Sequence, residues 1–378
     1  MNLIHTKNVL AKTIGFKFAY HGIIKPPRPS TLTFSVTSAC QSLCKTCNIG
    51  LHYQQNPSML KDDLTLDEIE KIFKAVGEIY FFNISGGEPF LRRDLPEIVD
   101  LACKYIKPKV IHTPTNALTP SLIEKKTREI LEVIKKNKSN IPFTIKPSYD
   151  GVGKQHDEIR GVKGNWEKLL ETISRLKKLQ KEYQNLYLGL GTVISRFNVK
   201  DIQKIADYAH NLSVDSYINE VAENRAEMFN LKDTITPSHE EYQEAMKYFS
   251  TEVKKRLKEK KMLVRFTDSF RIVYYDLVVD ILREKKQVIP CYAGISNVHI
   301  NAKGQIWSCC VLGYDHPMAD LREYNYDFNK AWQSEQANKV RKYIKDRNCA
   351  CPLANQSYSN ILLDIKSMGK VVKNIISA

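Results

Sequence analysis

The chain has 378 residues, 43% of them hydrophobic, and its 57 lysines and arginines exceed its 42 aspartates and glutamates by 15. This length allows about two domains with a buried core, and no apolar run approaches the roughly 18 residues that a membrane-spanning helix needs. The basic residues form no arginine-rich tract, so nucleic acid is not an expected partner, whereas a basic surface suits an acidic protein partner.

Residues 1–30 are predicted to form a basic amphipathic N-terminal extension. Its lysines are scattered among apolar residues, with no clean apolar region and no small-residue cleavage site, which favours a retained segment over a signal peptide. Nothing indicates export, so we expect a cytoplasmic location with reduced cysteines. Basic amphipathic ends can also lie on a bilayer surface, which leaves peripheral membrane contact open; packing against the rest of the protein is the reading we favour.

Residues 31–235 alternate short β-rich runs with longer helical patterns. Thr65 and Glu68 form a capping-box pattern at the start of the first helix. Strand–helix alternation predicts parallel strands with crossover helices. Six such units indicate an α/β fold of the partial (β/α)6, TIM-like barrel type. The predicted strands are 31–36, 79–85, 109–115, 143–148, 186–194 and 213–220, and the predicted helices are 66–77, 94–106, 121–137, 165–183 and 199–211.

The unusual polar segments all follow predicted strands. In barrels of this kind the chemistry lies at the C-terminal ends of the strands, so these segments are expected on one face. In chain order they are the cysteines at 40–47, then 86–89, 115–117, 148–151, 195–198 and 219–225.

After residue 235 the pattern changes to a helical linker, 236–285, which opens with a second capping box at Ser238 and Glu241. Residues 286–357 hold five further cysteines among short strands, including a hairpin around 301–304, and predict an α+β auxiliary domain. Residues 358–378 are predicted to form one C-terminal amphipathic helix. Its expected apolar stripe is Ile361, Leu362, Ile365, Met368, Val372 and Ile375.

Cys40, Cys44 and Cys47 have the spacing C-x3-C-x2-C in the first polar segment. Thiolates bind zinc or iron–sulfur clusters. A structural zinc ion requires four ligands, and a [4Fe–4S] cluster normally takes four thiolates. Three thiolates on a cubane leave one iron without a protein ligand, and that iron can coordinate a small molecule.

The cysteine motif after the first strand, together with "SGGEP" after the second, resembles the radical S-adenosylmethionine (radical SAM) superfamily across residues 31–235. The resemblance implies that Cys40, Cys44 and Cys47 hold three irons of a [4Fe–4S] cluster and that SAM chelates the fourth iron. A reduced cluster would pass one electron to the sulfonium, and the resulting 5′-deoxyadenosyl radical would abstract hydrogen from a substrate C–H bond, which is chemistry supplied by the cofactor.

The same resemblance implies roles for further residues. Gly86, Gly87 and Glu88 would meet the amino group of SAM, since glycines allow close backbone approach. Ser148 and Asp150 would contact the ribose or carboxylate, and Arg160 could pair with the carboxylate. Asn116, Ser195 and Asn198 are weaker cofactor-binding assignments, and surface or structural roles remain open for them and for Arg160. The residue before the third cysteine, Thr46, is not the aromatic residue frequent in this family, so no adenine contact is assigned.

The later cysteines resemble the SPASM extension, or its shorter Twitch form, found in a branch of this superfamily. Cys291, Gly304 and Cys309 have the spacing C-x12-G-x4-C. The resemblance implies an auxiliary [4Fe–4S] cluster, whose role could be electron acceptance or structure; a structural zinc site is the alternative. The implied ligands are Cys291, Cys309, Cys349 and Cys351, with Cys310 as a substitute ligand.

The substrate cannot be read from these residues. A small molecule, a sugar or a lipid-linked compound is the leading interpretation, and a two-electron oxidation through the auxiliary cluster would suit it. A peptide-modifying maturase is the alternative within the superfamily. A non-catalytic zinc- or cluster-binding interaction protein is the alternative from another class. The expected electron donor resembles flavodoxin or ferredoxin, because such acidic proteins suit the net charge of +15.

Overall fold

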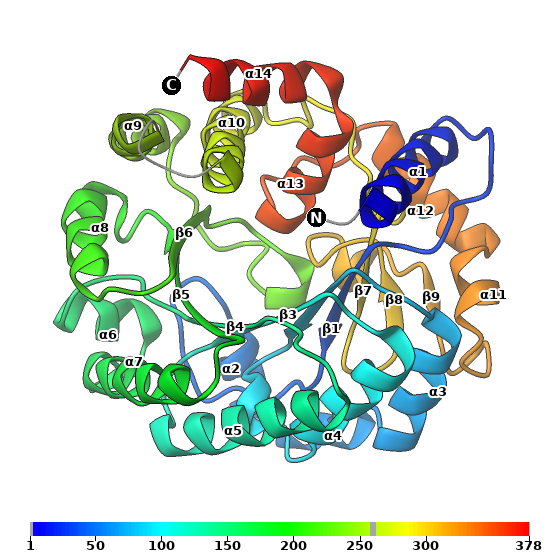
Figure 1. Cartoon of the computed structure of the whole chain (residues 1–378), viewed down its shortest axis with the longest axis horizontal. Helices are drawn as coiled ribbons and strands as arrows, with labels where there is room; N and C mark the ends of the chain where they lie inside the picture. The colour runs from blue at the N-terminus through cyan, green and yellow to red at the C-terminus, as the bar shows by residue number, and fades with distance from the viewer. Residues whose placement is uncertain (1–2, 258–261, 378) are drawn as a thin grey trace.

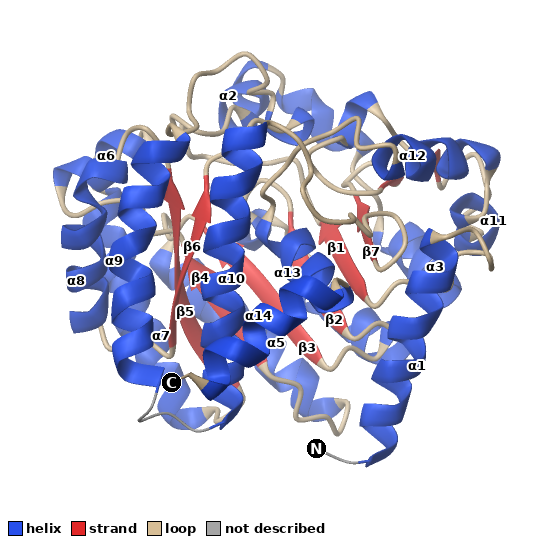
Figure 2. Cartoon of the chain, turned by 90° about the horizontal axis from the view of Figure 1, so that it is seen from above, coloured by secondary structure: helices blue, strands red, loops and turns tan. Residues whose placement is uncertain are grey.

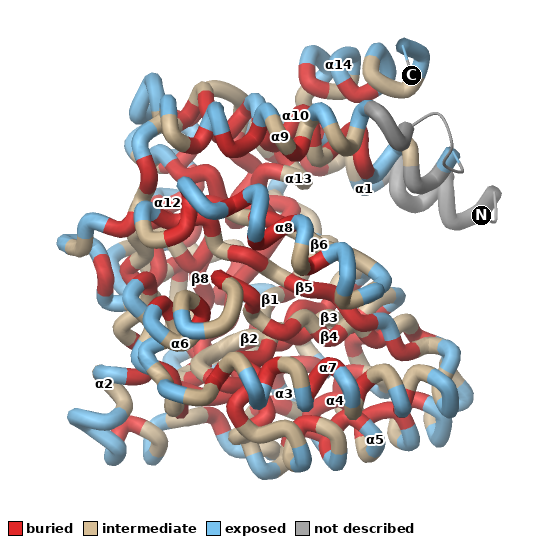
Figure 3. Tube along the Cα trace, turned by 90° about the vertical axis from the view of Figure 1, so that its left-hand side faces the viewer, coloured by how far each residue is buried: buried red, intermediate tan, exposed pale blue. Residues whose placement is uncertain are grey.

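The computed structural model describes residues 3–257 and 262–377 (Figure 1). Nine strands form a single sheet in the described part of the chain, in the order β6-β5-β4-β3-β2-β1-β7-β8-β9. Viewed from above, helices enclose these strands (Figure 2), and the strands lie mostly in buried regions, whereas exposed residues gather on the outer helices (Figure 3). No helix among the described residues is both long and apolar enough to cross a bilayer.

Strands β1 to β6 pair in parallel, each with its sequence neighbour. This confirms the prediction of an α/β fold with a partial barrel, and the strand bounds differ from the predicted ones by three residues at most. The strands are β1 (Thr31–Ser35), β2 (Phe81–Ser85), β3 (Val110–Thr115), β4 (Phe143–Pro147), β5 (Leu186–Ile194) and β6 (Ser216–Val221).

Crossover helices cover the outside of this sheet, and their apolar faces form the core. Phe34 of β1, Phe73 of α3 and Phe82 of β2 are fully buried, and the ring centroids of Phe34 and Phe73 lie 5.2 Å apart; burying each such ring contributes roughly 1.5–3 kcal/mol. The Thr65–Glu68 capping box is confirmed at the start of α3. The helices are α2 (Ile49–Gln55), α3 (Leu66–Val76), α4 (Leu95–Leu101), α5 (Pro120–Lys136), α6 (Lys154–Arg160), α7 (Asn165–Glu182) and α8 (Ile202–Asn211).

The auxiliary region continues the barrel sheet rather than forming a separate one. β7 (Asn297–Ile300) pairs in parallel with β1 on the side opposite β2. The predicted hairpin is present, since β8 (Gln305–Trp307) is antiparallel to β7. The pairing of β7 with β1 was not predicted, because it joins segments more than 260 residues apart in the sequence. The remaining elements are α9 (His239–Leu257), α10 (Met262–Glu284), β9 (Ala319–Asp320), α11 (Phe328–Trp332) and α12 (Glu335–Lys345).

The two ends of the chain pack on the auxiliary side of the molecule. In α1 (Leu3–Tyr20), Phe16 and Ala19 bury themselves against Tyr292, Ile295 and Leu363. Part of the N-terminal extension therefore packs on the protein, as favoured above.

The prediction of one continuous C-terminal helix was wrong. The structure has α13 (Ala354–Leu363) and α14 (Ile365–Ile376), which packs on α10. Asp364 separates them because its carboxylate accepts a hydrogen bond from the Ser367 backbone N–H (2.8 Å) and caps α14. The break shifts the buried face, so Val371 is buried while Ile365, in the predicted stripe, is 78% exposed.

Candidate functional site

The three N-terminal cysteines lie on a long loop between β1 and α2, at the C-terminal edge of the sheet. Cys40 is buried, whereas Cys44 and Cys47 are partly buried. Burial raises the pKa of Cys40 to about 11, so these thiols are protonated without a metal and lose a proton when they bind one.

Neighbouring loops hold the cysteine loop at both of its ends. The Asn48 backbone N–H donates to the Met228 carbonyl (2.9 Å), and the Asn230 side chain donates to the Thr46 carbonyl (2.8 Å). At the other side, the Glu88 backbone N–H donates to the Ala39 carbonyl (2.7 Å). The segment after β6 thus positions the cysteines, which the sequence alone did not indicate.

Gly86 and Gly87 lie where a side chain cannot fit. A Cβ atom on Gly87 would stand 2.1 Å from the Ala39 carbonyl oxygen, and one on Gly86 would stand 2.4 Å from the Thr37 carbonyl oxygen. Gly86 also has φ +121°, which disfavours any other residue. The backbone of the loop after β2 therefore packs directly on the backbone of the cysteine loop.

Glu88 is buried and joins the loop after β2 to the loop after β3. Its carboxylate accepts hydrogen bonds from the Asn116 backbone N–H (2.6 Å), the Thr115 hydroxyl (3.0 Å) and the Phe90 backbone N–H (3.2 Å). Burial raises the pKa of Glu88 to about 7. The Asn116 side chain in turn donates to the Gln41 side chain (3.2 Å) and lies 3.9 Å from the Cys40 sulfur.

Arg160 at the end of α6 faces the cysteine loop and pairs with buried Asp150 at 3.2 Å. Burial lowers the pKa of the Arg160 guanidinium, but the neighbouring Cys44, Asp150 and Cys40 side chains together raise it above its usual value. Among the described residues no acceptor bonds to its buried Nε. This unused donor beside the cysteines fits an anionic ligand such as a carboxylate.

Asp150, Ser195 and Asn198 lie in one buried hydrogen-bond network. Asp150 accepts from the Val193 backbone N–H (2.8 Å), the Asn198 side chain donates to the Asp150 carbonyl (2.9 Å), and its oxygen accepts from the Ser195 backbone N–H (2.8 Å). This network fixes the loop after β4 to the loop after β5.

A cavity of about 250 Å³ opens beside the cysteines, inside the barrel. It brings together most of the predicted site residues, but Asp150, Ser195 and Asn198 do not line it. The predicted residues that line it are Cys40, Cys44, Cys47, Gly86, Gly87, Glu88, Asn116, Ser148 and Arg160.

Charged residues of β4, β6 and the segment after β6 line the same cavity, and Lys146 among them was missed from the sequence. Lys146 of β4 pairs with Glu220 of β6 at 3.3 Å, and Glu223 pairs with Arg225 at 2.8 Å. Burial raises the pKa of Glu223 to about 7. The available signal was a polar residue inside an apolar strand, as in "FTIKP", where alternation turns it toward the barrel interior.

The later cysteines lie near one another. Burial is the largest cause of the raised pKa values of Cys349 and Cys351, and the nearby Cys291 and Cys309 thiols raise both further, as Glu223 does for Cys351. Cys310 also lies near Cys309, and its first charged neighbours are Arg225 and Glu227.

Within residues 3–257 and 262–377, neither cysteine set brings three sulfurs within 4.8 Å of one another.

Two family models match the chain. The Radical SAM superfamily matches residues 34–209, and the Iron-sulfur cluster-binding domain, SPASM, matches residues 291–352. The chain belongs to the radical SAM superfamily. The protein is thus an enzyme that uses a [4Fe–4S] cluster, SAM and an auxiliary iron–sulfur site. These matches confirm the predicted family, fold, activity class and cofactors. Enzymes of this superfamily reductively cleave SAM, which supplies a 5′-deoxyadenosyl radical for hydrogen abstraction, and they need a reductant.

Characterised relatives extend the match over the whole chain. The antilisterial bacteriocin subtilosin biosynthesis protein AlbA of Bacillus subtilis is 23% identical over 400 residues, covering 100% of this chain and 78% of AlbA. The AdoMet-dependent heme synthase of Methanosarcina barkeri is 27% identical over 192 residues, covering 50% of this chain and 49% of that protein. Homologues of this radical SAM chain therefore include more than one kind of enzyme.

Solved structures show the same fold. Streptococcus suis SuiB bound to the precursor peptide SuiA has a TM-score of 0.60 at 15% identity, covering 97% of this chain and 79% of SuiB. This likeness supports the arrangement of barrel and auxiliary region described above.

Proposed function

We propose that Cys40, Cys44 and Cys47 hold the radical SAM cluster and that the cavity beside them receives SAM. Gly86 and Gly87 line this cavity and would present backbone to the methionyl part of SAM. Glu88 holds the loops after β2 and β3 together through its buried hydrogen bonds. The close backbone packing of this loop on the cysteine loop supports the assignment.

We assign the SAM carboxylate to Arg160, whose Nε lacks an acceptor. Ser148 and Asn116 line the same cavity and would contact the cofactor directly. Asp150 acts as a positioning residue, since it pairs with Arg160; Ser195 and Asn198 hold Asp150 in place. The apolar side chains of Ile49, Met228 and Ile235 line the cavity as well, and we assign the adenine to this group in place of the missing aromatic residue at Thr46.

We assign the auxiliary cluster to Cys291, Cys309, Cys349 and Cys351 within a domain of residues 286–357. The mutual charge effects among these thiols support this set, and the closeness of Cys310 to Glu227 and His299 argues against its use as a substitute ligand. The remaining proposed boundaries are 1–30 for the N-terminal extension, 31–235 for the barrel, 236–285 for the helical linker and 358–378 for the C-terminal segment.

We propose a peptide as the substrate, which reverses the order of the two interpretations made from the sequence. The observation that carries this proposal is the match to AlbA, which spans the entire chain, whereas the match to the heme synthase spans half of it. Homologues of this chain act on peptide substrates. Two ion pairs in the cavity wall, Lys146–Glu220 and Glu223–Arg225, offer polar partners for a peptide backbone.

Co-expression tests the peptide proposal. The chain would be produced together with each short peptide encoded beside its gene, and the purified peptides would be analysed by tandem mass spectrometry. A peptide that has lost two hydrogen atoms, only when Cys40, Cys44 and Cys47 are intact, supports a peptide oxidation. Unchanged peptides, combined with turnover of a small molecule, would refute it.

Iron analysis tests the cluster assignments independently of the substrate. After anaerobic reconstitution we expect about eight irons per chain for two [4Fe–4S] clusters. Replacing Cys40, Cys44 and Cys47 by alanine should remove about half of this iron and all 5′-deoxyadenosine formation. Persisting SAM cleavage would refute the assignment of the first cluster.

The reductant is proposed to be an acidic flavodoxin- or ferredoxin-like protein, because the chain carries a net charge of +15 and opposite charges favour docking. Reduction by such a donor should slow as salt rises, since salt screens these charges. A salt-independent rate would argue against this kind of donor.

A lipid-linked substrate with peripheral membrane contact is the second candidate. The exposed apolar side chains of α14 support it, because Ile365 and Ile376 are both 78% exposed and lysines lie between them. Co-sedimentation with phosphatidylglycerol vesicles, compared between the wild type and Ile365→Ser/Ile376→Ser, tests this contact. Equal, weak sedimentation of both proteins would refute it.

A further inference from the structure

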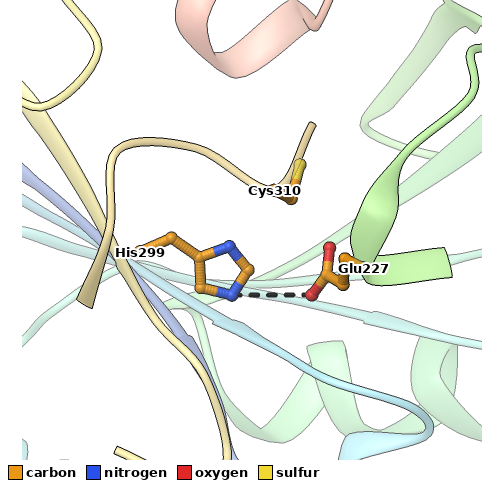
Figure 4. A group of neighbouring side chains, drawn as sticks. All are labelled: Glu227, His299 and Cys310. Carbon is orange, nitrogen blue, oxygen red and sulfur yellow. Dashed lines mark ion pairs between the residues drawn. The ribbon is translucent and has the colours of Figure 1, made fainter. Parts of the chain in front are cut away.

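Three metal-ligating side chains meet where the barrel contacts the auxiliary region. Glu227 lies in the short helix Ala226–Met228 after β6, His299 lies in β7, and Cys310 follows β8. Their ligand atoms all lie within 4.8 Å of one another, and within the described ranges this is the group of histidine, cysteine and acidic residues that meets this limit. Figure 4 shows the three side chains converging from separate segments.

The group is buried and preorganised. His299 is 3% exposed and Cys310 is 8% exposed. The Glu227 carboxylate lies 3.5 Å from His299 Nε2, as the dashed line in Figure 4 marks. The Ser35 hydroxyl lies 2.8 Å from the same nitrogen and donates to Glu227 at 3.3 Å. These contacts hold the ring and the carboxylate close together. A cation bound through Nε2 would replace the Ser35 contact to that nitrogen, while the Ser35 hydroxyl keeps its hydrogen bond to Glu227.

A cavity of about 80 Å³ lies against this group and adjoins the larger cavity beside the cysteines; Glu227, His299 and Cys310 all line it. This volume holds an ion together with a water molecule. Gln356 also lines the cavity, is 2% exposed, and has a buried amide oxygen to which no donor among the described residues bonds. An unpartnered acceptor at such a site favours a cation or an ordered water.

The donor set selects the metal. One thiolate, one imidazole and one carboxylate suit zinc, whereas magnesium and calcium prefer oxygen ligands alone. Arg225, whose positive charge opposes a cation here, is paired with Glu223 at 2.8 Å, which offsets much of that repulsion. The site also differs from both cysteine sets, neither of which brings three ligand atoms within 4.8 Å among the described residues.

We propose that Glu227, His299 and Cys310 bind one zinc ion that is separate from both iron–sulfur clusters. Three protein ligands leave one of the four zinc positions open, and water in the adjoining cavity fills it. The ion ties the segment after β6, which positions the cysteine loop, to β7 and the segment after β8. It therefore links the barrel to the auxiliary region.

Metal analysis of the reconstituted holoenzyme tests this proposal. We expect about one zinc and about eight irons per chain in the wild type. His299→Gln, Glu227→Gln and Cys310→Ala should each lower the apparent zinc affinity at least tenfold without loss of iron. Cys103→Ser, which changes a cysteine far along the chain from the three ligands, should keep both metals.

X-ray absorption at the zinc edge identifies the ligands. The proposal requires one sulfur at about 2.3 Å and two or three nitrogen or oxygen atoms near 2.0–2.1 Å. Zinc should also raise the melting temperature of the wild type but not of His299→Gln. If His299→Gln does not fold, Glu227→Gln and Cys310→Ala provide the same comparison.

Three outcomes would overturn the proposal. Zinc surrounded by four sulfurs would place it in a cysteine set. Loss of about half of the iron in Cys310→Ala would make Cys310 a cluster ligand. Zinc content unchanged in all three variants would leave the group without a metal, as a hydrogen-bond network that only packs the two regions together.

Discussion

Replacing Gly87 by alanine isolates the contact between the second loop and the cysteine loop. A Cβ atom there would lie 2.1 Å from the Ala39 carbonyl oxygen and 2.6 Å from the Ala39 carbonyl carbon. Both are backbone atoms, so no side chain can move aside. The Gly87 backbone does not have the positive φ that would strain alanine by itself, and the close approach is therefore the cause of any effect.

The size of the effect follows from these distances. The two loops must separate by roughly 1 Å to reach the 3.0 Å below which real Cβ contacts do not occur. Overpacking of this kind costs about 1–3 kcal/mol of stability. A displacement near 1 Å at a reacting site costs about 10²-fold in rate, and Cys40 follows Ala39 directly in the displaced loop.

We expect Gly87→Ala to form 5′-deoxyadenosine from SAM about 10²-fold more slowly than the wild type under dithionite, and to retain less iron after anaerobic reconstitution. Gly369→Ala is the matched control, because no atom lies within 4 Å of its added Cβ. It lies within α14, so alanine should stabilise the helix by about 0.5–1 kcal/mol. A wild-type rate and full iron content in Gly87→Ala would refute the reasoning.

Three further predictions follow from buried ionisable groups. Arg160→Met leaves the buried Asp150 carboxylate without its partner at 3.2 Å and should destabilise the protein by about 3–5 kcal/mol in chemical unfolding; an unchanged midpoint would contradict this. Lys146→Met removes a cavity-wall charge without touching the cysteine loop, so SAM cleavage without substrate should persist while substrate modification falls, and equal loss of both would count against a substrate role. Burial lowers the pKa of His156 from 6.5 to about 4, so below pH 6.5 the unfolded chain binds a proton that the folded chain does not. Stability should then fall between pH 6.5 and 4 by up to about 3 kcal/mol. His156→Gln should lack this part of the acid sensitivity, and identical pH profiles would disprove it.

The regular elements of the barrel could be predicted because their signals are local. β5 lies at 186–194, as its β-rich run indicated, and both capping boxes form the expected hydrogen bonds. The periods that predict strands and helices come from the spacing of apolar residues within one segment. The sequence of that segment alone therefore carries the signal.

Long-range pairings escaped prediction because nothing local encodes them. The break at Asp364 depends on a choice between continuing a helix and capping a new one, which packing against α10 helps to decide. Lys146 and Glu220 are ordinary charges in the sequence, and only barrel closure brings them within 3.3 Å. The same holds for Glu227, His299 and Cys310.

The sequence by itself indicated the chemistry of the first site, because three thiols within eight residues must lie on one loop. It also determined the alternating pattern that makes a partial barrel. Only the tertiary structure decided which side chains share the cavity, that Cys310 lies beside Glu227 and His299, and that β7 pairs with β1. These features arise when distant segments bury their surfaces together, so their geometry exists only in the folded chain.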